Sequence, residues 1–182
     1  MLIAFTGRAG SGKSTAAQHL VDRHGYLKLP FAGPLKGMCQ ALGLSQAEWS
    51  DPGLKNRPHP DFGYKSPRHI MQTLGTEWGR ETIDEDIWVN AWRRKLPRDY
   101  ANIVADDARF NNEVAAVLRL DGVVIRINRI SSDTAVTHPS EVVPTYYDGV
   151  INNEGDIATL KRLVDETMTT LRDVRGARRK ML

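Results

Sequence analysis

The chain has 182 residues, a formal net charge of +3 and one cysteine, and these values exclude several classes of protein. The length suits a single domain, residues 1–182, with a core of its own. We expect no membrane span, because no apolar run is long enough, and no signal peptide. Cys39 has no partner for an internal disulfide, so we expect a buried thiol and a reducing, cytoplasmic setting, the host cytoplasm if a phage encodes the chain.

Residues 7–14 read Gly-Arg-Ala-Gly-Ser-Gly-Lys-Ser, the G-x-x-x-x-G-K-[ST] pattern of a phosphate-binding loop. An apolar run at 2–6 precedes it and a helical pattern follows it, as the motif requires. A glycine-rich turn that only caps a helix is the plainer interpretation, and the Lys-Ser pair argues against it. We expect loop N–H groups to hold the phosphates of ATP, Lys13 to offset their charge and Ser14 to ligate Mg²⁺. The predicted ATP-binding residues are Gly7, Arg8, Ala9, Gly10, Ser11, Gly12, Lys13, Ser14 and Thr15.

Further strand-like segments alternate with helical patterns along the chain. After the strand at 2–6 we expect strands at 26–29, 102–105, 123–127 and 146–151, and a last helix from about Asp156. Strands separated by helices indicate a parallel sheet with helices on both faces. The sequence therefore predicts an α/β fold of the P-loop NTPase kind, with three α/β/α layers, a five-stranded parallel sheet and a helical substrate-binding insertion.

The insertion is the unusually long segment 33–100, between the second and third predicted strands. A simple crossover needs far fewer residues. Its pattern predicts helices at 34–42, 67–79 and 85–96, and a loop at 51–64. Because ligands of parallel sheets bind beyond the carboxyl ends of the strands, we expect the insertion to hold the second substrate. A short lid is expected at 128–145, with Arg129, His138 and Glu141 as candidates.

Phosphoryl transfer needs positive charge around the moving group. Arginines that could supply it are Arg68, Arg80, Arg109 and Arg129. Arg68 and Arg80 are twelve residues apart, so one face of a continuous helix could carry both. A surface salt bridge is the plainer role for any one arginine.

Two aspartates, Asp106 and Asp107, end the third predicted strand, where a P-loop enzyme places a carboxylate for Mg²⁺. Adjacent side chains on a strand point in different directions, so one could serve the metal or the acceptor while the other caps the next helix. The tryptophans Trp78, Trp88 and Trp92 are expected mainly in the core, although one could stack on a base.

Several stretches, in order along nearly the whole chain, resemble the bacteriophage deoxynucleoside monophosphate kinases. Two of them are more discriminating than the P-loop: the R-x-x-x-Q-x-L-G-T segment from Arg68 and the D-x-R-F-x-N-E segment from Asp107. The others are 31–36, 86–88, 138–141 and 151–155.

The resemblance implies a nucleoside monophosphate kinase-like fold and transfer of the ATP γ-phosphoryl group, with Mg²⁺, to a deoxynucleoside 5′-monophosphate. It implies Asn153 near the donor base, Arg129 in the lid, and catalytic roles for Lys13, Asp107, Arg109 and Arg129, with Ser14 and Asp107 at the metal. The implied acceptor-side residues are Lys36, Arg68, Gln72, Arg80, Trp88 and Glu113.

Other acceptors stay open at this stage, because the family is also similar to dephospho-coenzyme A kinases. A kinase of a modified base in DNA would suit the basic residues near the C-terminus, which are Arg172, Arg175, Arg178, Arg179 and Lys180. A solvated, frayed chain end is the plainer explanation of these residues, so nucleic acid is not an expected partner. A non-catalytic nucleotide-binding protein is a further alternative. The sequence leaves the preferred base, the choice between deoxyribose and ribose, and a homodimer open.

Overall fold

The computed structural model describes residues 1–99, 102–129 and 143–180, and their side chains as far as residue 173. The strands of these residues form one parallel sheet in the order β2-β3-β1-β4-β5. They are β1 (Leu2–Thr6), β2 (Leu27–Lys28), β3 (Ile103–Ala105), β4 (Val123–Asn128) and β5 (Gly149–Asn152). Each lies within a few residues of its predicted range.

Alternation along the strands gives the sheet two apolar faces. Ile3 and Phe5 of β1 pack on one face, with α1 (Lys13–His24) and α8 (Ile157–Lys180), whereas Ala4 packs on the other. That second face is covered by α6 (Ile87–Arg94) and α7 (Asn111–Arg119). Because successive strand residues point to opposite faces, a sheet covered on both sides needs continuous apolar strands, as β1 has.

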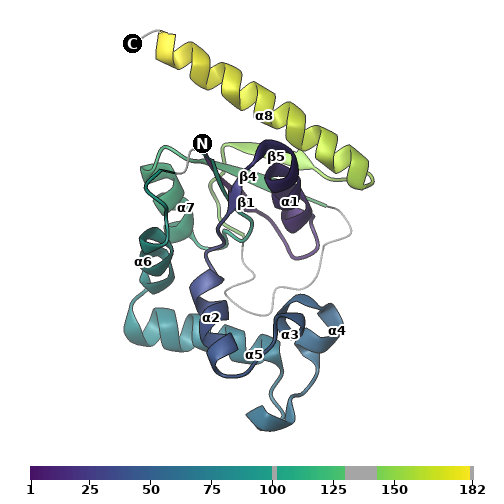
Figure 1. The fold of residues 1–182 in the computed structure, drawn as a ribbon, viewed down its shortest axis with the longest axis vertical. Coiled ribbons are helices and arrows are strands. Elements are labelled where there is room, and N and C mark those ends of the chain that lie inside the picture. Colours follow the sequence, from purple (N-terminus) through teal and green to yellow (C-terminus); the bar gives the residue numbers. More distant parts are fainter. Residues whose placement is uncertain (100–101, 130–142, 181–182) are drawn as a thin grey trace.

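The predicted three-layer α/β/α fold with a five-stranded parallel sheet is therefore confirmed. Figure 1 shows the sheet between these helices, with α8 at one end of the molecule and α2 to α5 gathered at the other. Strand β1 lies between β3 and β4, so the chain leaves the carboxyl end of β1 at the centre of the sheet. In the described residues, no helix combines the length and apolar character needed to cross a bilayer.

The segment between β2 and β3 folds into a helical unit with its own small core. Its elements are α2 (Gly33–Ala41), α3 (Gln46–Ser50), α4 (Pro52–Asn56), a 3₁₀ turn η1 (Pro60–Phe62), α5 (Pro67–Gln72), η2 (Thr73–Ile83) and α6. Leu35, Cys39, Leu44 and Trp88 form the buried centre of this unit. As expected, Cys39 is a buried free thiol.

Two predictions for the insertion need correction. The segment 51–64 is not simply a loop, because it contains α4 and η1. Both begin with a proline in the first turn, where its fixed φ favours a helix, and the Asp51 side chain caps α4 by accepting from the Gly53 and Leu54 N–H groups. The helix predicted at 67–79 continues to Ile83, but from Thr73 it is a π-helix, η2.

Candidate functional site

The P-loop folds as its glycines predict. Gly7 has a φ of +131°, and a Cβ there would lie 2.2 Å from the Ile127 carbonyl oxygen. Gly12 has a φ of +103°, and its Cβ would lie 2.7 Å from Nδ2 of Asn153. Any side chain at either position would therefore clash and strain the backbone. The loop leads directly into α1, whose N-terminus favours anions.

Lys13, the first residue of α1, folds back over the loop. Its Nζ donates to the carbonyl oxygens of Gly7 and Arg8, at 2.7 and 2.5 Å. Burial, and then the nearby Arg109 guanidinium, lower the pKa of Lys13 to about 8, although Asp106 and Asp107 oppose this change. The ammonium group is thus held at the centre of the loop, where an anion would restore its ordinary pKa.

Asp106 lies beside the P-loop. Its carboxylate is hydrogen-bonded to the Ser14 side chain and forms an ion pair with Lys28 at 2.7 Å. Its pKa is lowered because the bonds to Lys28 and Ser14 outweigh burial. An ionised carboxylate beside the P-loop hydroxyl is the donor set that Mg²⁺ prefers, so these two side chains fit a metal at the phosphates.

Asp107, our predicted metal ligand, is hydrogen-bonded to the backbone that follows β2. Its Oδ1 accepts from the Phe31 N–H and its Oδ2 from the Ala32 N–H, at 2.8 and 2.9 Å. Both oxygens therefore hold the β2–α2 loop, and burial with the neighbouring Asp106 charge raises the Asp107 pKa. Side chains of adjacent residues after a strand point apart, which separates the two aspartates. The geometry thus favours Asp106 as the metal-side carboxylate and places Asp107 at the acceptor loop.

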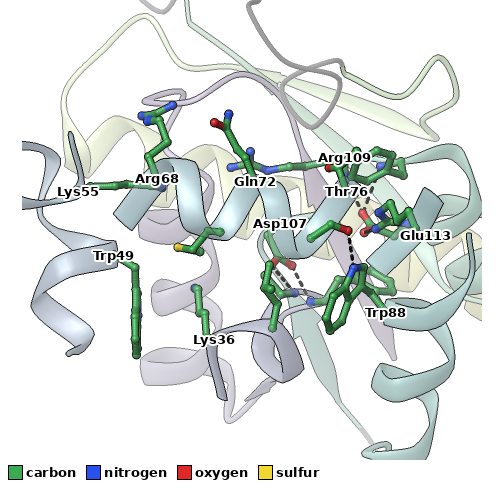
Figure 2. Close-up of a pocket in the computed structure, with 17 residues that line it drawn as sticks. Lys36, Trp49, Lys55, Arg68, Gln72, Thr76, Trp88, Asp107, Arg109 and Glu113 are labelled. Carbon is green, nitrogen blue, oxygen red and sulfur yellow. Dashed lines mark hydrogen bonds and ion pairs between the residues drawn. The ribbon is translucent and has the colours of Figure 1, made fainter. Parts of the chain in front are cut away.

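A cavity of about 180 Å³ lies between the insertion and the sheet edge. Figure 2 shows Arg68 and Gln72 projecting from α5 along it, with Asp107 near its centre. Five cationic side chains and two carboxylates line it, together with aromatic residues and a glutamine. The charged and polar members are Lys36, Lys55, Arg68, Gln72, Arg80, Asp107, Arg109 and Glu113. All six predicted acceptor-side residues, which include Trp88, are brought together here.

Arg80 makes a buried ion pair at the cavity wall. Its Nη2 lies 2.6 Å from Oε1 of Glu113, and the two side chains are 8% and 4% exposed. The guanidinium carbon also lies 3.7 Å from the centre of the Phe110 ring. Oε2 of Glu113 accepts from the Arg109 and Phe110 N–H groups at 2.7 and 3.1 Å. Burial raises the Glu113 pKa to about 7, against the lowering effect of Arg80.

Trp88 lines the cavity from α6, and its indole N–H donates to the Gly75 carbonyl oxygen at 2.7 Å. A Cβ on Gly79 would lie 2.7 Å from this indole ring, so the glycine lets η2 pack directly on it. Trp92 is buried in the core, as expected, whereas Trp78 is 38% exposed. The Arg68 Nε donates to the Asn56 side chain at 2.8 Å, which joins α5 to α4 beside the cavity.

Asn153 was predicted beside the donor base, but its side chain is buried under the P-loop. Its Nδ2 donates to the Ser11 carbonyl oxygen at 2.9 Å, and its N–H donates to the Asn128 carbonyl oxygen. It therefore braces the loop. Arg129 is exposed just after β4. Most of the predicted lid, including His138 and Glu141, lies outside the described residues.

The cavity residues that were not predicted as site residues include Trp49, Lys55 and Thr76. Trp49 and Lys55 come from α3 and α4, in or beside the stretch interpreted as a loop. Thr76 could have been predicted from the sequence, because it belongs to the R-x-x-x-Q-x-L-G-T segment.

This chain is similar to several known proteins. A family described as deoxynucleotide monophosphate kinase matches residues 55–164. A protein of Acanthamoeba polyphaga mimivirus, provisionally named deoxynucleotide monophosphate kinase, is 34% identical over 173 residues, covering 85% of this chain and 89% of that protein. The deoxynucleoside-5′-monophosphate kinase of Escherichia phage T5 is 34% identical over 92 residues, covering 45% of this chain and 36% of the phage protein. A crystal structure of shikimate kinase from Aquifex aeolicus superposes with a TM-score of 0.47 at 12% identity, covering 96% and 98% of the two chains.

The family match includes the cavity residues from Lys55 to Glu113, and the mimivirus protein aligns over most of both chains. The chain belongs to the deoxynucleotide monophosphate kinase family.

Proposed function

We propose that this chain transfers the γ-phosphoryl group of ATP to a deoxynucleoside 5′-monophosphate, giving the deoxynucleoside diphosphate. The observation that carries the proposal is that Asp106 and Asp107 are adjacent in sequence but face different sites. Asp106 is bonded to Ser14 of the P-loop, and Asp107 lines the cavity of the insertion. A donor site and an acceptor site therefore meet at the end of β3.

On the donor side, the P-loop N–H groups and Lys13 would bind the β- and γ-phosphates. Ser14 and Asp106 would hold Mg²⁺, which offsets the negative charge of these phosphates when it is bound. Lys13 lies among carbonyl oxygens and is partly desolvated, so its attraction to an anion is stronger than on an open surface. Asn153 acts on this side indirectly, by holding the Ser11 carbonyl.

On the acceptor side, the excess of cations over carboxylates suits a phosphate monoester, which carries about two charges near neutral pH. Arg68, Lys36 and Lys55 are the candidates for this phosphate, whereas Arg80 is engaged by Glu113. Gln72 offers both a donor and an acceptor to a base edge, and the cavity's aromatic rings offer stacking.

Arg109 is the candidate for contact with both substrates. It lines the acceptor cavity, and its charge also acts on Lys13 of the P-loop. A guanidinium between donor and acceptor would stabilise the charge of the transferring phosphoryl group. Arg129 remains a proposed lid residue.

An acceptor panel tests the proposal. ADP release is measured with ATP, Mg²⁺ and each of the four deoxynucleoside monophosphates, the ribonucleotides, duplex DNA and dephospho-coenzyme A. We expect turnover with one or more deoxynucleoside monophosphates. Arg68→Ala should raise the KM for the monophosphate by about tenfold or more, at an almost unchanged KM for ATP. Arg94→Ala is the matched control, because this exposed arginine at the end of α6 does not line the cavity. Activity with DNA or dephospho-coenzyme A alone would contradict the proposal.

A further inference from the structure

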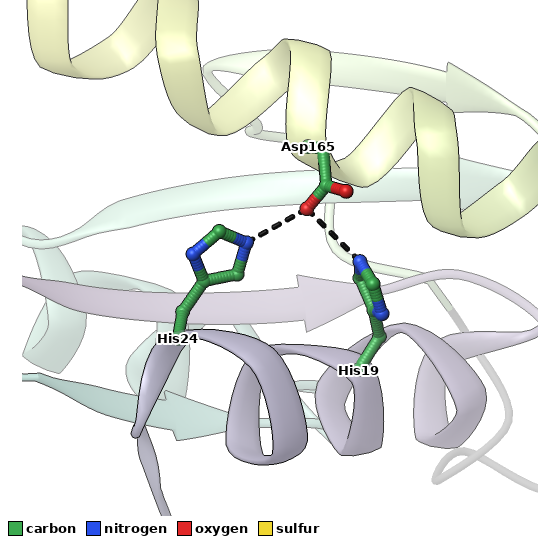
Figure 3. Close-up of side chains that lie close together, drawn as sticks. All are labelled: His19, His24 and Asp165. Carbon is green, nitrogen blue, oxygen red and sulfur yellow. Dashed lines mark hydrogen bonds and ion pairs between the residues drawn. The ribbon is translucent and has the colours of Figure 1, made fainter.

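Two histidines of α1 and one aspartate of α8 converge on the side of the sheet away from the acceptor cavity. Nε2 of His19 lies 2.9 Å from Oδ1 of Asp165, and Nε2 of His24 lies 2.7 Å from the same oxygen. Figure 3 shows both rings pointing at this carboxylate. The two imidazole planes are nearly perpendicular, at 89°. Three potential ligand atoms therefore meet at one point, all within 4.8 Å of one another.

We propose that His19, His24 and Asp165 form a binding site for a divalent transition-metal ion, namely Zn²⁺, that joins α1 to α8. Two imidazole nitrogens and one carboxylate oxygen are a donor set for such an ion, with water in the remaining position. Mg²⁺, by contrast, prefers oxygen ligands, so this site is chemically different from the donor site at Ser14.

The two histidine–carboxylate distances need little adjustment to hold the ion, and the two imidazole nitrogens, which lie within 4.8 Å of each other, must also approach. Ligand atoms of a tetrahedral zinc site are about 3.3 Å apart, so the two nitrogens need to move about half an ångström from Asp165 Oδ1. The metal would take the place of the two N–H hydrogens. His19 is largely buried and Asp165 is 33% exposed, so the site is partly enclosed but open to an ion from solvent.

The surroundings also support a cation here. His24 is the last residue of α1, and the C-terminal end of a helix carries partial negative charge. The Arg23 Nε lies 3.4 Å from Oδ2 of Asp165, the oxygen that the histidines do not use. Arg23 would thus orient the carboxylate so that only Oδ1 faces the metal, although its own charge opposes the ion.

The expected role is structural rather than catalytic. Lys13 and His24 are at opposite ends of α1, about 16 Å apart along the axis at 1.5 Å per residue. None of the three ligands lines the cavity. A bound ion would hold the carboxyl end of the P-loop helix to α8. The proposal is therefore independent of the proposed function.

Cobalt and zinc titrations test it on untagged, chelator-treated full-length protein without Mg²⁺. Co²⁺ should bind at one ion per chain with visible d–d absorption bands, and Zn²⁺ should displace it. Zn²⁺ at a hundred times its Kd should raise the Tm by about 5–10 °C. His24→Gln is the most discriminating variant, because the glutamine amide can still donate to Asp165 but is a poor zinc ligand. It should weaken binding about 100-fold or more.

His59→Gln is the matched control. His59 also meets a carboxylate, Glu48 at 3.0 Å, but no third ligand joins this pair among the described residues. The control should leave the Co²⁺ spectrum unchanged. If circular dichroism shows that His24→Gln does not fold, Asp165→Asn provides a second variant that lacks one ligand. The proposal would be overturned if the wild type did not bind one ion per chain, or if both ligand variants bound the ion as tightly as the wild type. The cluster would then be only a hydrogen-bonded contact between two helices.

Discussion

Replacement of Arg80 by alanine should act mainly on the stability of the fold rather than on acceptor binding. The change removes the cation from Glu113, whose side chain is only 4% exposed. Breaking a buried ion pair in this way costs about 3–5 kcal/mol, because a charge is left without a partner. For a domain of this size, each kcal/mol lowers the Tm by about 2–4 °C, so we expect a fall of about 6–20 °C.

The loss should depend on pH in a defined direction. Burial already raises the Glu113 pKa to about 7, and removal of Arg80 takes away its main opposing charge, so the pKa rises further. A carboxyl group with a raised folded-state pKa binds more protons in the folded than in the unfolded chain. Stability therefore falls as pH rises from about 4.3, the unfolded value, through the folded pKa. Arg80→Ala should be close to wild type at pH 5 and most destabilised above pH 8.

Urea and thermal unfolding measure this effect, with Arg94→Ala as the exposed-arginine control expected within about 0.5 kcal/mol of wild type. Glu113→Gln combined with Arg80→Ala should cost at least about 2 kcal/mol less than the sum of the single changes, because no lone charge is left. An Arg80→Ala protein with wild-type Tm at pH 8 and a raised KM for the monophosphate would refute this reasoning. Arg80 would then be a phosphate ligand.

Four further substitutions separate the donor side from the acceptor side. Asp106→Asn should lower kcat and raise the Mg²⁺ concentration that gives half the maximal rate. Asp107→Asn should raise the KM for the monophosphate and leave the Mg²⁺ dependence unchanged. Initial rates measured over a Mg²⁺ titration would show whether Asp107, rather than Asp106, is the metal-side carboxylate. Lys13→Ala should reduce kcat by about 10²–10³-fold, from a loss of about 3–4 kcal/mol, with an unchanged circular dichroism spectrum, and a near-normal rate would remove Lys13 from the reaction. Asn153→Ala should raise the KM for ATP by about tenfold, because it frees the Ser11 carbonyl, and an effect only on the monophosphate KM would count against that role. We proposed that protonated Lys13 binds the phosphates of ATP. Because the Lys13 pKa is about 8 without ligand, ATP affinity should then fall as pH rises above about 8, with proton uptake on binding visible by calorimetry in two buffers.

The parts of the site that could be predicted are those encoded by contiguous residues. The P-loop is one such part, since its glycine spacing and flanking segments fix the local backbone. The strands of the sheet could be predicted equally well, because apolar strands such as β1 and β4 are bounded by clear breaks in the pattern. The predicted acceptor-side residues came from short segments that resemble the family, and the cavity brings them together.

Most features that could not be predicted depend on pairs of residues that are far apart in the sequence. The sequence cannot tell that Arg80 meets Glu113, 33 residues later, or that Asn153 reaches back to Ser11 across 142 residues. The roles of Asp106 and Asp107 depend on a one-residue register at a strand end, which a motif does not define. The π-helix escaped for a different reason, since the helical pattern from Thr73 does not reveal its hydrogen-bond spacing.

Label transfer tests the central claim most directly. The protein is mixed with Mg²⁺, [γ-³²P]ATP and a deoxynucleoside monophosphate, and the products are separated by anion-exchange chromatography. We predict radioactivity in the deoxynucleoside diphosphate, in an amount equal to the ADP formed, and a rate of labelling about 10²–10³-fold lower with Lys13→Ala. Label found only in inorganic phosphate, at a rate that does not depend on the monophosphate, would contradict the assignment of the cavity as an acceptor site.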